Sequence, residues 1–194
     1  MGIQVITSFL IYTVISAFTP GPGNILALNT MVNHGWKKGK PLFLGIFFGY
    51  FFVQTFCAIL IFSLDNLISP LTTILKYVGA VYILWLAYQV IISKPGNDHS
   101  DHQPSFFTGF ILQIVNVKIL LLGITALTGY IVPYYDSLDA LLFFVTIISI
   151  TGSAATLAWI LFGKVFQNFY FKHFKVINII LGIILVQCAI ALFI

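Results

Sequence analysis

The chain has 194 residues, of which 60% are hydrophobic and only 7% are charged. A soluble domain carries about 25% charged residues and, at roughly 150 residues, buries only about 70% of its unfolded surface. The composition therefore excludes a soluble enzyme, a disordered chain and a disulfide scaffold, and it predicts a polytopic membrane protein. The net charge of +4 comes without a basic stripe, so no nucleic-acid partner is expected.

Long apolar runs predict an all-α membrane domain, because crossing about 30 Å of hydrocarbon takes about 20 helical residues. These runs lack the alternation of a β-barrel, and the first has no cleavage site, so we expect it to be retained. The predicted spans are Ile3–Met31 (interrupted), Pro41–Ser63, Leu71–Ser93, Phe106–Tyr130, Leu138–Gly163 and Val176–Ile194. The connectors predicted as loops are His34–Lys40, Leu64–Pro70, Lys94–Ser105, Ile131–Ser137 and Lys164–Lys175.

The lysines predict the orientation of these six spans. Seven of the nine lie in the first, third and fifth connectors, whereas the other two connectors contain aspartate and no lysine. Lysine-bearing loops normally face the cytoplasm, so both termini are predicted on the outer, periplasmic side, and Lys76 is expected to snorkel to the outer headgroups. Three spans in each half force residues 1–97 and 98–194 into opposite orientations. The predicted fold is a single transmembrane domain of six helices, built as two inverted three-helix repeats.

The first span is interrupted by two prolines and two glycines. Each proline removes an N–H group and disfavours helix for the residue before it. Unwound backbone at membrane depth is tolerated only inside protein or beside a watery cavity. There, free carbonyls could receive an ammonium group, and the next half-helix, beginning near Asn24 and capped by it, could receive a carboxylate. The alternative is a plain turn that leads into an interfacial helix. The residues predicted here to bind a substrate are Pro20, Gly21, Pro22, Gly23 and Asn24.

Lys118 is the thirteenth residue of the 25-residue run Phe106–Tyr130, which places it at mid-span. A lysine at the bilayer centre costs about 2.5–3.5 kcal/mol on insertion scales, so we expect it to hold a substrate carboxylate or to exchange a proton. The alternative is a structural lysine bonded to helix carbonyls. Gln113 and Asn116 share a helix face and are predicted to bind substrate with Lys118. Asn116 and Lys118 are about 200° apart on a regular helix, so either the helix is distorted there or the two serve different neighbours.

Other polar and small residues of the spans are assigned mainly to helix packing. In the fifth span and around the second these are Ser149, Thr151, Ser153 and Thr156, and Gly35, Gly39, Gly45 and Gly49. Gln54, Asn178 and Gln187 fit either a polar path or hydrogen bonds between helices. Cys57 and Cys188 are expected to be buried thiols rather than a disulfide. The loop with His99 and His102 is interpreted as a solvated linker, with a regulatory metal site as the alternative.

At these residues the chain resembles the LysE/RhtB-type amino-acid exporters, and the similarity runs through nearly the whole chain. The segments that carry it are residues 19–28, His34-Gly35, residues 76–87 and residues 113–119. The resemblance implies a six-span inner-membrane protein that exports small amino acids by a gradient-driven mechanism, most similar to the branch that exports cysteine and O-acetylserine. The Pro-Gly-Pro element of the family falls on residues 20–22. Its Asn-Pro-Lys element falls on Asn116 and Lys118, with Val117 in place of proline.

The sequence thus predicts an exporter of small neutral amino acids, with cysteine and O-acetylserine as leading substrates, working by alternating access in a bacterial inner membrane. No cofactor or metal is expected. Protons as coupling ion and a homo-oligomer stay open; without Glu or mid-span Asp, Lys118, His34 or the substrate would have to carry the proton. The alternatives are an exporter of homoserine or threonine, another solute carrier or channel, a non-transporting membrane subunit, and an intramembrane enzyme. An enzyme would need a nucleophile–base pair that the spans lack.

Overall fold

In the computed structural model every described element is helical, which confirms the predicted all-α class. The structure describes residues 1–19, 21–63, 104–165 and 167–190, together with eight positions between 77 and 92. Several predictions lie outside the described residues, namely those on Pro20, Lys76, most of the span Leu71–Ser93, the loop with His99 and His102, and the side chain of Cys188. The helices are α1 (Ile3–Phe18), α2 (Pro22–Ser63), α4 (Phe106–Ile114), α5 (Val117–Ala126), the π-helical turn η2 (Leu127–Ile131), α6 (Leu138–Val165), α7 (Gln167–Lys172) and α8 (Phe174–Ile190).

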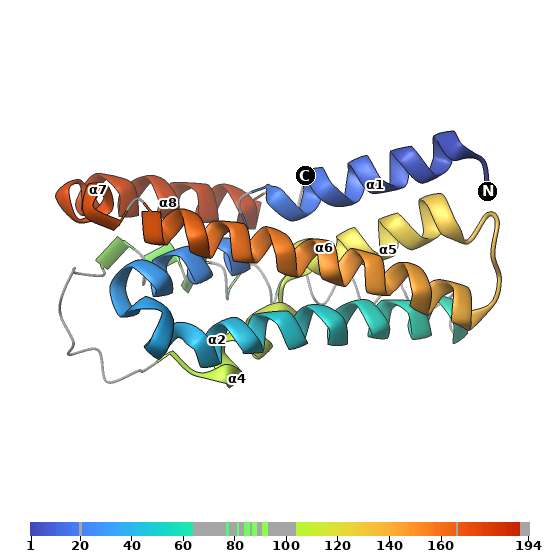
Figure 1. Ribbon diagram of the computed structural model, residues 1–194, viewed down its shortest axis with the longest axis horizontal. Helices are drawn as coiled ribbons and strands as arrows, with labels where there is room; N and C mark the ends of the chain where they lie inside the picture. The colour runs from blue at the N-terminus through green and yellow to red at the C-terminus, as the bar shows by residue number, and fades with distance from the viewer. Residues whose placement is uncertain are drawn as a thin grey trace.

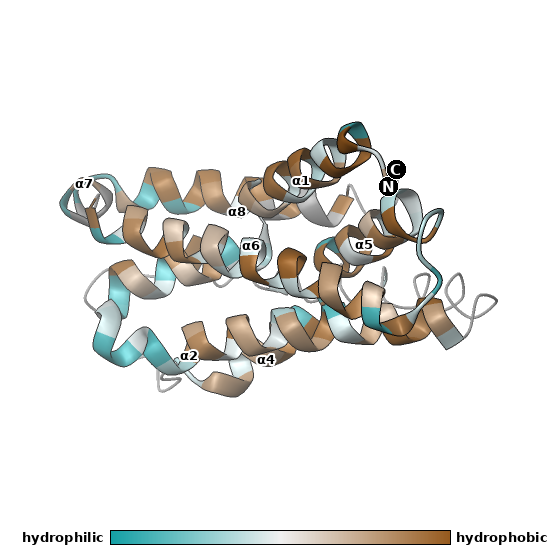
Figure 2. Cartoon of the chain, turned by 45° about the vertical axis from the view of Figure 1, so that its right-hand side comes forward, coloured by the Kyte–Doolittle hydropathy of each residue, from teal (hydrophilic) through white to brown (hydrophobic). Residues whose placement is uncertain are grey.

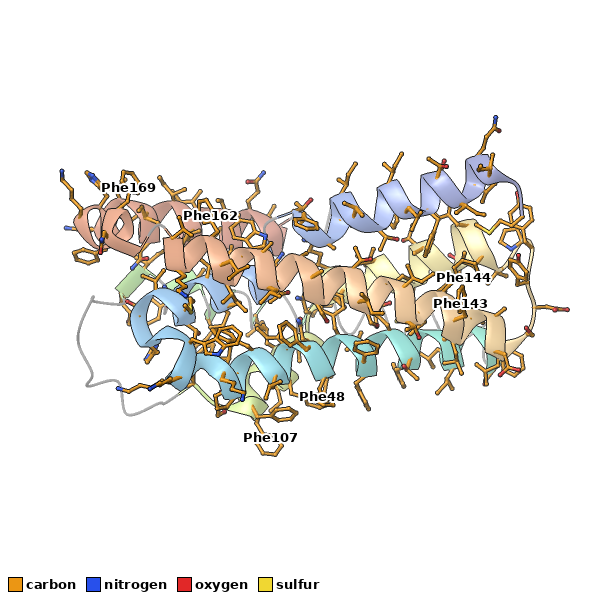
Figure 3. The ribbon with its side chains drawn as sticks, in the orientation of Figure 1. Phe48, Phe107, Phe143, Phe144, Phe162 and Phe169 are labelled. Atoms are coloured by element: carbon orange, nitrogen blue, oxygen red, sulfur yellow. The ribbon has the colours of Figure 1, made fainter. Side chains whose placement is uncertain are left out.

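The helices run along the long axis of an elongated bundle (Figure 1). By length and composition, α2 and α6 can each cross a membrane, and the bent pair formed by α4 and α5–η2 gives a third candidate. Most residues along the bundle are hydrophobic (Figure 2), and many large apolar side chains are exposed. Phenylalanines stand on the outer surface (Figure 3), and Phe48, Phe107 and Phe143 are each more than half exposed. Such a surface is stable in lipid rather than in water, because lipid tails are as apolar as these side chains.

The first predicted span is present in two pieces. α1 runs from the N-terminal end of the bundle to its middle, and the first part of α2 continues in the same direction (Figure 1). The long helix α2 is itself kinked at Gly35, whose φ of 69° and ψ of 177° are not helical. Beyond this kink the chain reverses, and the rest of α2 returns along the bundle. The connection between the interrupted span and the second span is therefore helical except at one residue, Gly35.

Two connectors predicted as loops are mostly helical, and those predictions are wrong. His34–Lys40 is helical apart from Gly35, and Lys164–Lys175 contains the end of α6, all of α7 and the start of α8. The lysines do not stop a helix, because they are good helix formers and a helix satisfies its backbone groups internally. By contrast, α6 agrees with its predicted span to within two residues, and α8 covers the described part of the last span.

Close packing of α2 on α4 depends on glycine. A Cβ atom at Gly45 would overlap the carbonyl of Phe106, and one at Gly109 would overlap the carbonyl of Leu42. The packing role predicted for Gly45 and Gly49 is therefore confirmed. Gly35 corrects the same prediction, since a Cβ atom there would meet nothing within 4 Å. Its positive φ explains the glycine instead, because side chains other than glycine rarely adopt this conformation.

An aromatic cluster closes the N-terminal end of the bundle between α1, η2 and α6. The ring of Phe9 is almost fully buried and meets Tyr130 and Phe144 edge to face, with ring centroids 6.4 and 5.4 Å apart. Tyr12, one turn along α1 from Phe9 toward its middle, lies against Tyr130 at 5.7 Å. Edge-to-face pairs of this kind contribute beyond their buried area, so this end is firmly packed. We call Phe9, Tyr130 and Phe144 the aromatic seal.

Candidate functional site

The break between α1 and α2 lies at the middle of the bundle. α1 ends at Phe18, and the first hydrogen bond of α2 joins the Ile25 N–H to the Gly21 carbonyl at 2.9 Å. The half-helix therefore begins at Pro22, two residues before the predicted start, where a missing N–H costs nothing. Asn24 does not cap this half-helix as predicted. Its amide instead donates to the Ala17 carbonyl at 2.9 Å and to the Thr19 carbonyl at 3.3 Å.

Asn24 also ties the break to α6. Its side-chain oxygen accepts a hydrogen bond of 3.0 Å from the hydroxyl of Thr156, and both side chains are buried. On the same helix, the indole of Trp159 donates to the carbonyl of Phe18 at 3.2 Å. Carbonyls freed at the end of α1 are thus satisfied from α2 and α6. Thr156, which the sequence assigned to packing, belongs to this hydrogen-bond network.

The fourth span is broken in the same plane. α4 ends at Ile114, α5 begins at Val117, and the two axes differ by 53°. Asn116 between them is extended (φ −80°, ψ 91°), and its amide donates to the side-chain oxygen of Gln113 at 3.2 Å. The distortion that would reconcile Asn116 with Lys118 is therefore present, although position 117 is valine rather than proline. The remaining amide atoms, Gln113 Nε2 and Asn116 Oδ1, are buried with no hydrogen-bond partner among the described residues.

Lys118 joins the two breaks. Its Nζ donates a hydrogen bond of 2.6 Å to the carbonyl oxygen of Thr19. The two glycines of the first break make room for this contact. A Cβ atom at Gly21 would lie 3.0 Å from Cδ and 3.1 Å from Nζ of Lys118, and one at Gly23 would lie 3.1 Å from the amide of Gln113. Segments almost a hundred residues apart in the chain thus meet through one ammonium group and two glycines.

A small cavity lies where the breaks meet. Its volume is about 10 Å³, close to the space one buried water needs. Six of the predicted residues line it, whereas Pro22 is buried beside it and is not part of its wall. The full lining is Ala17, Gly21, Gly23, Asn24, Tyr50, Gln113, Asn116, Lys118 and Ile119. Among these described residues Lys118 supplies the only charge.

Tyr50, Ala17 and Ile119 line the cavity without having been predicted. Ala17 and Ile119 carry no chemistry that distinguishes them from other residues of an apolar span. Tyr50 offered one signal, a phenol hydroxyl in the middle of the second span. Its position depends on α6, because its ring lies directly on Gly152, where a Cβ atom would overlap it. Gly152 therefore sets how far the ring reaches toward the cavity.

Four helix ends converge on this cavity. The two N-terminal ends favour negative charge, and the two C-terminal ends favour positive charge. α2 and α5 begin here, so each presents N–H groups of its first turn and the positive end of its dipole. α1 and α4 end here, and they present carbonyl oxygens. Within the described residues no group of three His, Cys, Asp or Glu side chains could hold a metal ion. The one described cysteine, Cys57, is a buried free thiol, as predicted.

Apolar helices of membrane-spanning length, broken in pairs around a buried polar cavity, define a membrane transport protein. Residues 14–194 match the LysE type translocator family, and the chain belongs to this family. It is 39% identical over 186 residues, 95% of each chain, to a cysteine/O-acetylserine efflux protein of Klebsiella pneumoniae. It is 35% identical over 189 residues, 97% of each chain, to the protein of that name from Escherichia coli K12. No solved structure matches the chain. The family is one of translocators rather than enzymes.

Proposed function

We propose that this protein exports small neutral amino acids across the inner membrane, with cysteine and O-acetylserine as its main substrates. Membership of the translocator family and the names of its relatives support this assignment. The observation that carries it is the Lys118–Thr19 hydrogen bond across the two helix breaks. An ammonium group and a carbonyl at a helix break, at one point in an apolar bundle, are the partners that the two ends of a zwitterion need.

The substrate would enter by replacing this hydrogen bond. Its carboxylate would accept from Lys118 Nζ and from the N–H groups at the start of α2, near Gly23 and Asn24, where the helix dipole favours an anion. Its ammonium would donate to the released Thr19 carbonyl and to Asn116 Oδ1, which has no partner among the described residues. Lys118 and the Thr19 carbonyl would then have hydrogen-bond partners both with and without substrate, and Asn116 Oδ1 would gain one.

The size of the cavity supports a closed conformation. About 10 Å³ accommodates a single water molecule and not an amino acid. We therefore infer a closed conformation, in which Thr19 holds Lys118 until substrate separates them. Transport by alternating access would require the walls to part on one side and then on the other, with the breaks as the fixed centre.

We propose that the full architecture is six transmembrane helices in two inverted halves, 1–97 and 98–194. Two features support this division. Pro20 and Asn116 are 96 positions apart in the sequence, close to half its length. The broken pair α1–α2 also runs opposite to the broken pair α4–α5 (Figure 1). Homologous positions of two inverted repeats would place their breaks face to face, as these are.

Both termini are proposed to face the periplasm. α7 and the Gly35 kink lie at one end of the bundle, and the N-terminus lies at the other (Figure 1). The first end carries the lysines that flank these two features, Lys37, Lys38, Lys40, Lys164, Lys172 and Lys175. Lysines gather on the cytoplasmic side of membrane proteins. We also propose protons as the coupling ion. Lys118 or the substrate would carry the proton, because the described spans contain no carboxylate at cavity depth.

The test is counterflow of labelled amino acids through the purified protein in proteoliposomes. We expect cysteine and O-acetylserine to exchange fastest, and net efflux to accelerate under a pH gradient. Faster exchange of homoserine or threonine would replace the substrate assignment while keeping the export function. No exchange of any amino acid, from protein that is folded and inserted, would contradict export itself.

A further inference from the structure

A second set of buried polar side chains lies one helical turn from the cavity. Thr13 precedes Ala17 by a turn on α1, Gln54 follows Tyr50 by a turn on α2, and Ser149 precedes Gly152 by nearly a turn on α6. α1 and α6 run away from the N-terminal end of the bundle, and the second part of α2 runs toward it (Figure 1). All three steps therefore lead toward that same end. We call Thr13, Gln54 and Ser149 the polar layer.

The polar layer is fully buried and its hydrogen bonds are incomplete. All three side chains have 0% exposure. Thr13 Oγ1, Gln54 Oε1 and Ser149 Oγ have no hydrogen-bond partner among the described residues. Buried polar groups are nearly always paired in native proteins. Three unpaired atoms at one level, contributed by three helices, therefore point to a ligand that binds there for part of the transport cycle.

Neighbouring hydroxyls behave differently, which argues against a purely structural role. Thr7, Thr146 and Thr151 donate to the carbonyl four residues earlier, at 2.9, 2.9 and 2.8 Å. This bond within the helix is the usual way to satisfy a hydroxyl in an apolar environment. Thr13 and Ser149 lie on the same two helices, α1 and α6, and do not form it. Their oxygens are thus kept available inside the bundle.

Gln54 defines what the polar layer can bind. Its amide nitrogen donates to the carbonyl of Ile119 at 2.9 Å, which fixes the orientation of the amide and leaves Oε1 as an acceptor beside Gly123. The hydroxyls of Thr13 and Ser149 can accept as well. No charged side chain belongs to the layer. An arrangement of neutral acceptors suits a cationic donor, and a primary ammonium group provides donors for three acceptors.

We propose that the polar layer is a second substrate site, which holds the ammonium of the departing amino acid between the central cavity and the aromatic seal. This inference rests on the proposed function. Phe9 precedes Thr13 by one helical turn and so lies nearer the N-terminal end of the bundle. The aromatic seal is therefore the next barrier beyond the polar layer. A passing zwitterion would move from Lys118 and Thr19 to the layer, and leave when Phe9, Tyr130 and Phe144 separate.

The test removes two hydroxyls and leaves their volume almost unchanged. Thr13→Val with Ser149→Ala is compared with Thr7→Val with Thr146→Val, which removes two hydroxyls that bond within their own helices. Binding of labelled cysteine to detergent-purified protein reports the central cavity, and counterflow in proteoliposomes reports passage. We expect unchanged affinity, and counterflow about tenfold slower in the first variant only, since two hydrogen bonds to the passing ammonium are lost. Thr13→Ser should retain the normal rate.

Three other results would overturn the second site. Counterflow equal to that of the control variant would mean that the hydroxyls only fill space. Normal counterflow with loss of pH-driven efflux would mean that the layer carries protons through water instead of substrate. Loss of cysteine binding along with counterflow would mean that the layer supports the central cavity. A wild-type protein that exchanges no amino acid would refute the proposed function itself. Counterflow of the wild-type protein, without any variant, distinguishes this outcome.

Discussion

The ammonium of Lys118 and the carbonyl oxygen of Thr19 are 2.6 Å apart, although 99 positions separate the two residues in the chain. The contact joins the break of the first span to the break of the fourth. It satisfies the cation with a carbonyl that the broken helix cannot use. The same contact makes both groups available together when a zwitterion separates them.

Replacing Lys118 by methionine should abolish export while the protein still inserts. Methionine retains the length of the side chain and loses the cation. Since a hydrogen bond to a charged group contributes about 1.5–3 kcal/mol, the affinity for cysteine should fall roughly 10- to 100-fold. Binding of labelled cysteine to the purified variant measures this. Lys164→Met, at the exposed end of α6, is the matched control, and normal export by Lys118→Met would remove the ammonium from the mechanism.

Gly21→Ala should weaken substrate binding with little effect on folding. The added Cβ atom would lie 3.0–3.1 Å from the Lys118 side chain, so the ammonium must shift away from the position in which it would hold the substrate carboxylate. We expect cysteine affinity to fall about tenfold, the equivalent of one lost hydrogen bond of roughly 1.4 kcal/mol. Gly129→Ala, where a Cβ atom meets nothing within 4 Å, serves as control. Equal affinities of the two variants would contradict the close fit at Gly21.

Gly35→Ala should destabilise the protein through its backbone alone. With φ 69° and ψ 177°, the residue occupies a region where alanine is strained by about 1–3 kcal/mol. A Cβ atom there touches nothing, so packing does not contribute. Thermal unfolding in detergent should show a lower midpoint than for Gly2→Ala, another position with open space. An unchanged midpoint would mean that the kink can straighten without loss.

Tyr50→Ala should change which amino acids are exported. The ring forms part of the cavity wall and rests on Gly152, so its removal enlarges the space beside the substrate. We expect the rate for larger side chains, such as methionine, to rise roughly tenfold relative to cysteine, as pocket size typically discriminates. A counterflow panel measures the ratio. Tyr50→Phe keeps the ring and should keep the wild-type order of substrates; a shift in this variant would assign selectivity to the hydroxyl instead.

The course of the helices could be predicted where hydrophobicity alone decides it. α6 begins at Leu138 as expected and ends two residues beyond the predicted Gly163, because an apolar run in lipid has to form a helix. The lysine-bearing connectors could not be predicted in this way. In water beside the membrane, loop and helix both satisfy the backbone, and the charge of Lys37 or Lys172 does not distinguish between them. The Gly35 kink likewise depends on one φ angle, which a single glycine permits but does not require.

The candidate site could be predicted where the cost of burial is high. Lys118, Asn116 and Gln113 are expensive in a membrane, and each lines the cavity. Tyr50 could not be singled out, because tyrosine is common in apolar spans and its position depends on Gly152 from a helix that is distant in sequence. The polar layer could not be recognised in the sequence either, because Thr13 and Ser149 look like ordinary packing residues. Only the structure shows that their hydroxyls are unpaired.

Valine at position 117 makes the two interruptions mechanically unequal. Pro22 has no amide hydrogen, so α1 and α2 cannot join into one straight, continuous helix. Val117 retains its amide hydrogen, and rotation about Val115 and Asn116 alone would let α4 and α5 fuse. The helix break in the first half of the chain is thus permanent, whereas the break in the second half can close and reopen. We expect the larger backbone rearrangement of each turnover to take place in the second half of the chain.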